Sequence, residues 1–276
     1  KDFLVLCHEG FVLLLGDIKM KPQDKPKALV TGSSSGIGFA YARHLSKNGW
    51  NLDLVSQNPE RAKAARAKLK GQPTTTHLAD LSDQRQTSAL LRKIVTPDLI
   101  VANAGITHAS SVGKTEEKRR LELTYLLYGG VVELIEHYLP KMLERGAGRI
   151  VIISSIGAIT PMPKSSIYAS AKAGVYAYGR SLNEELREKN VSVTVSLPGY
   201  VRTNAHRRAG LTHLETRIPK WMWVTPEQVV KETEAASLLN RAYVVPGLVY
   251  RLVSPFLGSK VANLAWRALN KRSNSS

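Results

Sequence analysis

The sequence predicts a single α/β domain in which a parallel sheet of about seven strands carries helices on both faces. From residue 27 onward, short apolar runs alternate with longer segments of helical periodicity, which is the pattern of strands joined by crossover helices. No internal repeat or low-complexity linker divides the 276 residues, and a hydrophobic content of 43% is enough for one large core.

The elements follow in a regular order along the chain. Strands are predicted at 28–31, 52–55, 74–78, 98–102, 149–154, 191–197 and 242–245. The first helix runs through Lys47, and the second begins at Asn58-Pro-Glu, an N-cap with a proline at the first helical position, and ends at Gly71. A long helix is predicted at about 121–145, interrupted at Gly129-Gly130, and another at 167–189. The capping box Thr225-Pro-Glu-Gln starts the last well-marked helix.

The composition limits the classes of partner and site. A net charge of +17 favours anionic partners such as phosphate cofactors, acidic carriers, an anionic membrane face or nucleic acid, or else it belongs to a solvated surface. No nucleic-acid-binding motif accompanies the charge, so nucleic acid is not expected. The single Cys7 excludes an internal disulfide and fits a reducing, cytoplasmic compartment. The seven histidines have no metal-binding spacing, so no metal site is expected.

Residues 1–26 are expected to form an appendage of undetermined role. The apolar stretch 3–15 is interrupted by His8, Glu9 and Gly10, which makes it too short and too polar to span a bilayer. The residues after it do not form the cleavage site of a signal peptide.

A glycine-rich turn, Thr31-Gly-Ser-Ser-Ser-Gly-Ile-Gly, directly follows the first predicted strand and opens the first helix. Gly32 permits the tight turn, Gly36 lets the backbone approach a pyrophosphate, and Gly38 lets the helix pack closely on the strand. The N-terminus of the helix favours negative charge. A purely structural turn is the alternative. The residues predicted to hold a dinucleotide here are Gly32, Ser34, Ser35, Gly36, Ile37 and Gly38.

This turn resembles the cofactor loop of the short-chain dehydrogenase/reductase family, and three further family-like elements follow in order over about residues 27–250. Asp80-Leu81 is similar to the element that holds the adenine ring, Asn103-Ala104-Gly105 resembles the element beside the cofactor, and Pro198-Gly199, with Val201 and Thr203, resembles the motif that flanks the nicotinamide. The resemblance implies a Rossmann-type doubly wound catalytic domain over residues 27–247 that transfers hydride between a nicotinamide and a carbonyl or alcohol. It also implies a homodimer or homotetramer, which the small residues of helix 167–189 would suit.

The end of the second strand bears on the choice between NADP and NAD. An acid there would bind the ribose hydroxyls of NAD and repel a 2′-phosphate. The sequence reads Ser56-Gln57-Asn58, with Arg61 one helical turn further, whereas Asp53 lies too early in the strand. NADP is therefore favoured over NAD, with Gln57 among the contacts, although relatives that prefer NADP often carry a basic residue near this position.

The candidate catalytic residues are Ser155, Tyr168 and Lys172. Tyr168 and Lys172 lie at i and i+4 on one helical face. The lysine ammonium, together with an oxidised nicotinamide, is expected to lower the tyrosine pKa from about 10, so that Tyr168 acts as general acid in reduction and general base in oxidation. Ser155, with Ser154 as its rival, is expected to bind the substrate oxygen. By family resemblance Lys172 also holds the nicotinamide ribose. An ordinary amphipathic surface is the alternative for this pair.

One position departs from the family. Many relatives carry an asparagine in the long helix that organises a water of the proton relay, and here that position falls on Leu127, which has no hydrogen-bonding side chain. Either the relay runs differently, for example through Thr124, or activity is reduced. The alternative function is therefore a dinucleotide-binding sensor or scaffold with little or no turnover.

Two segments bear on the substrate and surroundings. Residues 200–224 lie where the family places its substrate lid, and His206-Arg-Arg with Trp221-Met-Trp predicts an apolar pocket with a basic rim, unless the tryptophans are core or dimer contacts. The substrate is then a hydrophobic carbonyl compound, lipid-, acyl- or steroid-like, with Met162 as a further lining candidate. The basic, apolar tail 248–276 either caps the subunit, which we favour, or makes peripheral contact with an anionic membrane.

Overall fold

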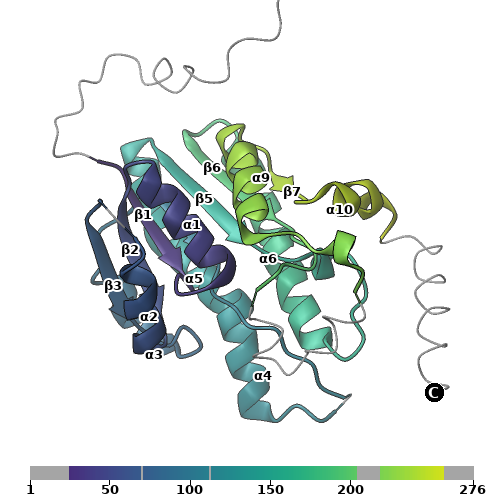
Figure 1. Ribbon diagram of the computed structural model, residues 1–276. Helices are drawn as coiled ribbons and strands as arrows, with labels where there is room; N and C mark the ends of the chain where they lie inside the picture. Colours follow the sequence, from purple (N-terminus) through teal and green to yellow (C-terminus); the bar gives the residue numbers. More distant parts are fainter. Residues whose placement is uncertain (1–24, 70, 112, 204–217, 258–276) are drawn as a thin grey trace, which may run out of the picture.

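The computed structural model describes residues 25–69, 71–111, 113–203 and 218–257. The predictions for residues 1–24, for His206-Arg-Arg and for 258–276 therefore lie outside the described residues. Seven parallel strands form one sheet in the order β3-β2-β1-β4-β5-β6-β7, which confirms the predicted α/β class (Figure 1). The chain order reverses between the neighbours β1 and β4, and in doubly wound sheets the ligand crevice lies at the carboxyl ends of such a pair.

The strands agree with the predicted apolar runs to within one residue at each end. The central strand β4 is apolar throughout because both faces of the sheet are covered there, and all four of its residues are buried. One core layer packs α1 and α9 on the sheet, and the other packs α3, α5 and α6 on the opposite face (Figure 1). The strands are β1 (Lys27–Thr31), β2 (Asn51–Ser56), β3 (Thr74–Leu78), β4 (Leu99–Ala102), β5 (Gly148–Ile153), β6 (Val191–Ser196) and β7 (Tyr243–Val244).

The predicted N-caps are confirmed, whereas the helix that begins after Asn58 ends at Arg66 and not at the predicted Gly71. The Asn58 side chain accepts a hydrogen bond of 2.8 Å from the Arg61 amide, and the Thr225 hydroxyl accepts one of 3.1 Å from the Gln228 amide. Helix α3 was not predicted, and its cap is the Asp83 carboxylate. The helices are α1 (Gly36–Lys47), α2 (Pro59–Arg66), α3 (Gln84–Leu91), α4 (Glu117–Thr124), α5 (Gly130–Arg145), α6 (Ser166–Glu185), α9 (Pro226–Leu238) and α10 (Leu248–Val253), with short 3₁₀ turns η2 (Ile156–Ala158), η3 (Lys220–Met222) and η4 (Ser254–Phe256).

The long helix before β5 differs from the prediction. It is interrupted by a π-helical turn, η1 (Tyr125–Gly129), that joins α4 to α5 without breaking the helical path. Gly129 itself has helical backbone angles, so the Gly129-Gly130 pair is not a break. A side chain on Gly130 would crowd the Tyr125 carbonyl at 3.1 Å, and the two glycines thereby make room for the wider turn.

The described residues bear on membrane insertion and on metal binding. None of the described helices combines the length and the apolar composition needed to cross a membrane. The described part of the chain also contains no group of three histidine, cysteine, aspartate or glutamate side chains that could hold a metal ion.

Candidate active site

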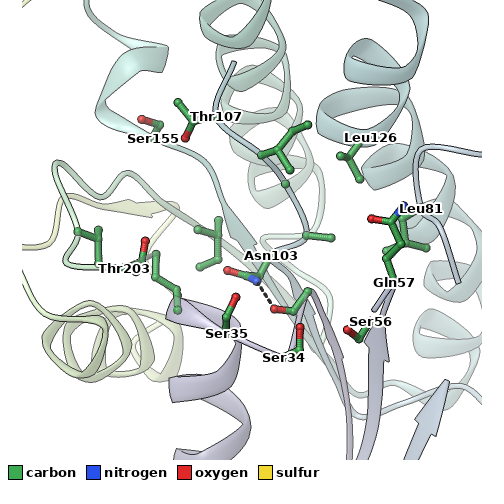
Figure 2. Close-up of a pocket in the computed structure, with 18 of the residues that line it drawn as sticks. Ser34, Ser35, Ser56, Gln57, Leu81, Asn103, Thr107, Leu126, Ser155 and Thr203 are labelled. Atoms are coloured by element: carbon green, nitrogen blue, oxygen red, sulfur yellow. Dashed lines mark hydrogen bonds between the residues drawn. The ribbon is translucent and has the colours of Figure 1, made fainter. Parts of the chain in front are cut away.

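A cleft opens at the carboxyl ends of β1 and β4, at the reversal of the strand order. Figure 2 shows Ser155 and Thr107 at one end of this cleft and Gln57 with Leu81 at the other, with the glycine turn along one side. The predicted cofactor residues that line the cleft are Gly32, Ser34, Ser35, Gly36, Ile37, Gln57, Asp80, Leu81, Asn103, Ala104, Gly105, Tyr168, Lys172, Pro198, Gly199, Val201 and Thr203.

Gly38 is the exception, because it lies beneath the turn rather than in the cleft. A Cβ on Gly38 would overlap the Asn103 amide and the Gly32 carbonyl, so its lack of a side chain lets helix α1 pack against the turn. Gly32 and Gly36 have positive φ angles of 63° and 58°, a region that L-residues rarely adopt. A Cβ on Gly32 would also lie 2.9 Å from the Ala104 Cα. Backbone conformation at two of these positions and close packing at the third therefore favour glycine.

The turn is braced from β4. The Asn103 side-chain amide donates to the carbonyl oxygen of Thr31 at 2.9 Å. It also donates to that of Gly32 at 3.3 Å, which is the dashed line in Figure 2. The Thr31 hydroxyl in turn accepts hydrogen bonds of 2.9 Å from the amides of Asn103 and Ala104. These bonds fix the mouth of the cleft between β1 and β4.

The start of α1 fits the phosphate group of a dinucleotide. Its first turn contains no acidic residue, and the side chain of the N-cap residue Ser35 makes no capping hydrogen bond to it. The positive end of the helix dipole therefore faces the cleft without a counter-charge from this helix, which favours an anion.

The other end of the cleft is polar and contains a basic residue that the prediction noted but did not include among the contacts. Gln57 Nε2 donates to Asp80 Oδ2 at 2.7 Å, and the other Asp80 oxygen accepts from Ser82. Arg61 and Ser56 also line the cleft. Arg61 enters because the Asn58 cap starts α2 immediately after β2 and places this residue in the first turn.

The three candidate catalytic residues lie together in the cleft. The Lys172 ammonium is almost fully buried and donates to the Ile153 carbonyl at 2.8 Å. The Ser155 hydroxyl accepts from the Gly157 amide at 3.1 Å and forms a hydrogen bond with Tyr168. The rival Ser154 donates instead to the Lys172 carbonyl at 2.8 Å, which commits its hydroxyl to holding helix α6 on β5.

The Tyr168 pKa was predicted to be lowered by Lys172 together with an oxidised nicotinamide, but the protein groups alone raise it. Burial raises the pKa of Tyr168, and the hydrogen bond with Ser155 offsets only part of this effect. Burial also lowers the pKa of Lys172 to about 8. Loss of solvation therefore dominates both groups, since it disfavours the phenolate and the ammonium alike.

Leu127 borders the lysine but gives it no hydrogen-bonding partner. It is fully buried with Leu123 and Ala171, and both its side chain and the Lys172 ammonium lie against Gly105. The alternative relay through Thr124 is not supported, because this residue is exposed and lines an outer groove beside Tyr125 rather than the cleft. The preceding residue, Leu126, lines the cleft and was not predicted.

The predicted lid is described only at its two ends. Trp221 is exposed, and Trp223 lies against Tyr200, with 5.7 Å between the ring centroids. Neither tryptophan lines the main cleft. Met162 does not line it either, because its sulfur covers Gly157.

Known proteins resemble this chain in sequence. The family model described as short chain dehydrogenase matches residues 26–213. The chain belongs to the short-chain dehydrogenase family. A 3-oxoacyl-[acyl-carrier-protein] reductase FabG of Chlamydia muridarum is 32% identical over 184 residues, covering 64% of this chain and 74% of that protein. A dehydrogenase/reductase SDR family member 4 of Bos taurus is 31% identical over 199 residues, covering 70% and 71%.

Solved short-chain dehydrogenases share the fold. A short-chain dehydrogenase from Sphingobium yanoikuyae in complex with NADPH is 26% identical with a TM-score of 0.74, covering 89% of this chain and 95% of that one. A variant of the actinorhodin polyketide ketoreductase with NADPH is 25% identical with a TM-score of 0.73, covering 83% and 97%. As a short-chain dehydrogenase, the chain is an NAD(P)-dependent oxidoreductase.

Proposed function

We propose that this short-chain dehydrogenase uses NADPH to reduce the carbonyl group of a hydrophobic substrate, with Tyr168 as the general acid. The observation that carries the proposal is the meeting of Ser155, Tyr168 and Lys172 in the same cleft as the glycine turn of α1. A bound nicotinamide would supply the hydride.

The side chains have separate roles in this proposal. The Ser155 hydroxyl hydrogen-bonds the substrate oxygen and stabilises the negative charge that develops on it. Tyr168 donates its phenolic proton to that oxygen. Lys172, whose pKa of about 8 leaves it mainly protonated at neutral pH, stabilises the phenolate that remains and holds the nicotinamide ribose.

Tyr168 is protonated near neutral pH, because burial raises its pKa, and the protonated phenol is the form that a general acid needs in reduction. The relatives named 3-oxoacyl-[acyl-carrier-protein] reductase are consistent with this direction.

Arg61 supports NADP as the favoured cofactor, with NAD as the alternative. It lines the cleft beside Ser56 and Gln57, at the end of β2, where a 2′-phosphate would lie, and the tip of β2 carries no acid that would repel the phosphate. Two solved neighbours are complexes with NADPH. Arg61→Ala is expected to weaken NADPH binding by roughly ten-fold or more and to leave NADH binding unchanged, since an arginine–phosphate hydrogen bond is charge-assisted. Equal affinities in the variant and the parent would refute this assignment.

A hydrophobic substrate is supported by the apolar side chains that line the cleft, including Ile106 and Val201. An acyl chain is one such substrate, and relatives act on 3-oxoacyl groups by name. The test is a panel of long-chain 3-oxoacyl thioesters, bulky ketones and small polar sugars, followed by loss of NADPH absorbance. Turnover of the sugars alone would refute the hydrophobic class.

Tyr168→Phe is the control for the mechanism. It is expected to abolish turnover almost completely while the variant still binds NADPH, because only the hydroxyl is removed. A variant that turns over like the parent would refute the catalytic assignment. A parent that binds NADPH but reduces no compound of the panel would favour the alternative, a sensor or scaffold with little turnover, for which Leu127 is the specific observation.

Helix α10, near the C-terminus, supports contact with an anionic membrane surface. Tyr250 packs inward, as the predicted cap requires, but Leu248, Leu252 and Phe256 are 64–67% exposed at helical spacing. Residues 235–276 contain six lysines and arginines and no acid, which would suit an anionic membrane surface. Replacing the three exposed residues with serine should abolish flotation with anionic liposomes. No flotation of the parent would refute the contact. Homo-oligomerisation and a cytoplasmic location remain predictions.

A further inference from the structure

The two described ends of the predicted lid are paired with each other. Val201 and Val224 form a parallel bridge. The Arg202 amide donates to the Val224 carbonyl, and the Val224 amide donates to the Tyr200 carbonyl, both at 2.9 Å. The outgoing segment therefore lies beside the returning one, directly after the Pro198-Gly199 motif.

A tyrosine from the C-terminal helix α10 joins these two segments from outside the cleft. The Tyr250 hydroxyl accepts a hydrogen bond from the Tyr200 amide at 3.1 Å and donates one to the Met222 carbonyl at 2.8 Å. The first of these groups lies on the outgoing segment and the second on the returning one. In Figure 1, α10 lies beyond the edge strand β7, so its contribution comes from a part of the chain outside the sheet.

The ring of Tyr250 also holds the nicotinamide-flanking motif. It is 4% exposed and packs in one apolar cluster with Leu197, Val201 and Val224. A Cβ on Gly199 would overlap the Tyr250 ring, so glycine is needed here for the close approach of the ring. Burial raises the pKa of Tyr250 to about 12, and the hydroxyl therefore remains a hydrogen-bond donor at neutral pH.

We propose that Tyr250 is a positioning residue for the nicotinamide half of the cofactor, acting through the segment from Pro198 to Thr203. This inference rests on the proposed function. Pro198, Gly199, Val201 and Thr203 line the cleft, and Tyr250 supports them from behind without lining it. The residues at the adenosine end, such as Gln57 and Asp80, follow β2 and β3, on the far side of β1 in the strand order.

Tyr250→Phe is the test, because it keeps the ring against Gly199 and removes both hydrogen bonds. Binding of NADPH is compared with binding of 2′,5′-ADP, which carries the adenosine half and the 2′-phosphate but no nicotinamide. The variant is expected to bind NADPH roughly ten-fold more weakly, the effect of losing one or two net hydrogen bonds, and to bind 2′,5′-ADP as the parent does. The matched control is Tyr243→Phe, because Tyr243 is half-exposed on β7 and its ring contact with Tyr176 survives the change.

The possible results distinguish a failure of this proposal from a failure of the proposed function. An equal loss of affinity for both ligands would show that Tyr250 only stabilises the fold, and unchanged NADPH affinity would show that its hydroxyl positions nothing. Either result overturns the proposal and leaves the proposed function intact. A parent that binds neither ligand overturns both.

Discussion

Burial of the Lys172 ammonium should make the protein less stable than a variant without that charge. The side chain is 6% exposed, and its pKa falls from 10.5 to about 8 because burial disfavours the charged form. At about 1.4 kcal/mol per pKa unit, this difference corresponds to a penalty of about 3 kcal/mol on the free energy of unfolding. Lys172→Met removes the penalty but also loses the hydrogen bond to the Ile153 carbonyl, at about 1 kcal/mol. The variant is therefore expected to be more stable by about 2 kcal/mol at pH 7, although it loses activity.

The pH dependence identifies the cause. Because the pKa in the folded state lies below that in the unfolded state, the penalty is fully present below pH 8. It is relieved as the pH rises from about 8 towards 10.5, where the unfolded chain still binds a proton that the folded protein has lost. The advantage of the variant should therefore shrink above pH 8 and vanish near pH 10.

Urea unfolding of parent and variant at several pH values between 7 and 10 measures this difference directly, since the other titrating groups are common to both proteins. Lys141→Met is the matched control, because this lysine is exposed and bears no burial penalty. A stability difference between parent and Lys172→Met that stays constant over this pH range would refute the reasoning.

Three further predictions concern other parts of the molecule. Gly38→Ala should abolish NADPH binding, because the new Cβ would overlap Asn103 and Gly32. Gly49→Ala is the control: its Cβ would meet no atom within 4 Å, and its positive φ should lower only the melting temperature. Equal NADPH affinities for the two variants would contradict this prediction. Tyr41→Phe should lower the free energy of unfolding by about 2 kcal/mol, because the buried Tyr41 hydroxyl donates to the Glu234 carboxylate. NADPH affinity should stay unchanged. A urea midpoint equal to that of the parent would contradict this prediction. Leu127→Asn should raise the turnover number several-fold, because it restores a polar group to the proton relay. It should also lower the free energy of unfolding by about 2 kcal/mol, because the amide is buried. An unchanged turnover number would show that the missing polar group does not limit the relay.

The strands and the glycine turn were predictable because their physical requirements are local. A strand buried on both faces is mostly apolar, and β4 shows this directly. The turn needs glycine where φ is positive, at Gly32 and Gly36. Helix α3 escaped prediction because only Thr87, Leu90 and Leu91 of its eight residues are buried, which leaves a weak apolar pattern.

The parts that escaped prediction depend on contacts between distant segments. Tyr250 meets Tyr200 across 50 positions, and no local pattern marks either residue. The prediction for Tyr168 considered the charge of Lys172 but not the burial that both side chains share. Arg61 could be placed one turn after β2, but its inclusion in the cleft follows from the exact start of α2, which the Asn58 cap sets.

The π-helical turn connects these observations. A turn with one extra residue changes the direction of successive side chains, and the neighbours Leu126 and Leu127 now serve two surfaces. Leu126 lines the cleft, while Leu127 packs beside Gly105 and the Lys172 ammonium. An asparagine at position 127 would bring a polar group close to the lysine, whereas leucine makes this wall of the site apolar. The same apolar wall contributes to the burial that lowers the pKa of Lys172 and favours the protonated phenol of Tyr168. The departure from the family at one position therefore helps to explain the stability that this site costs the fold.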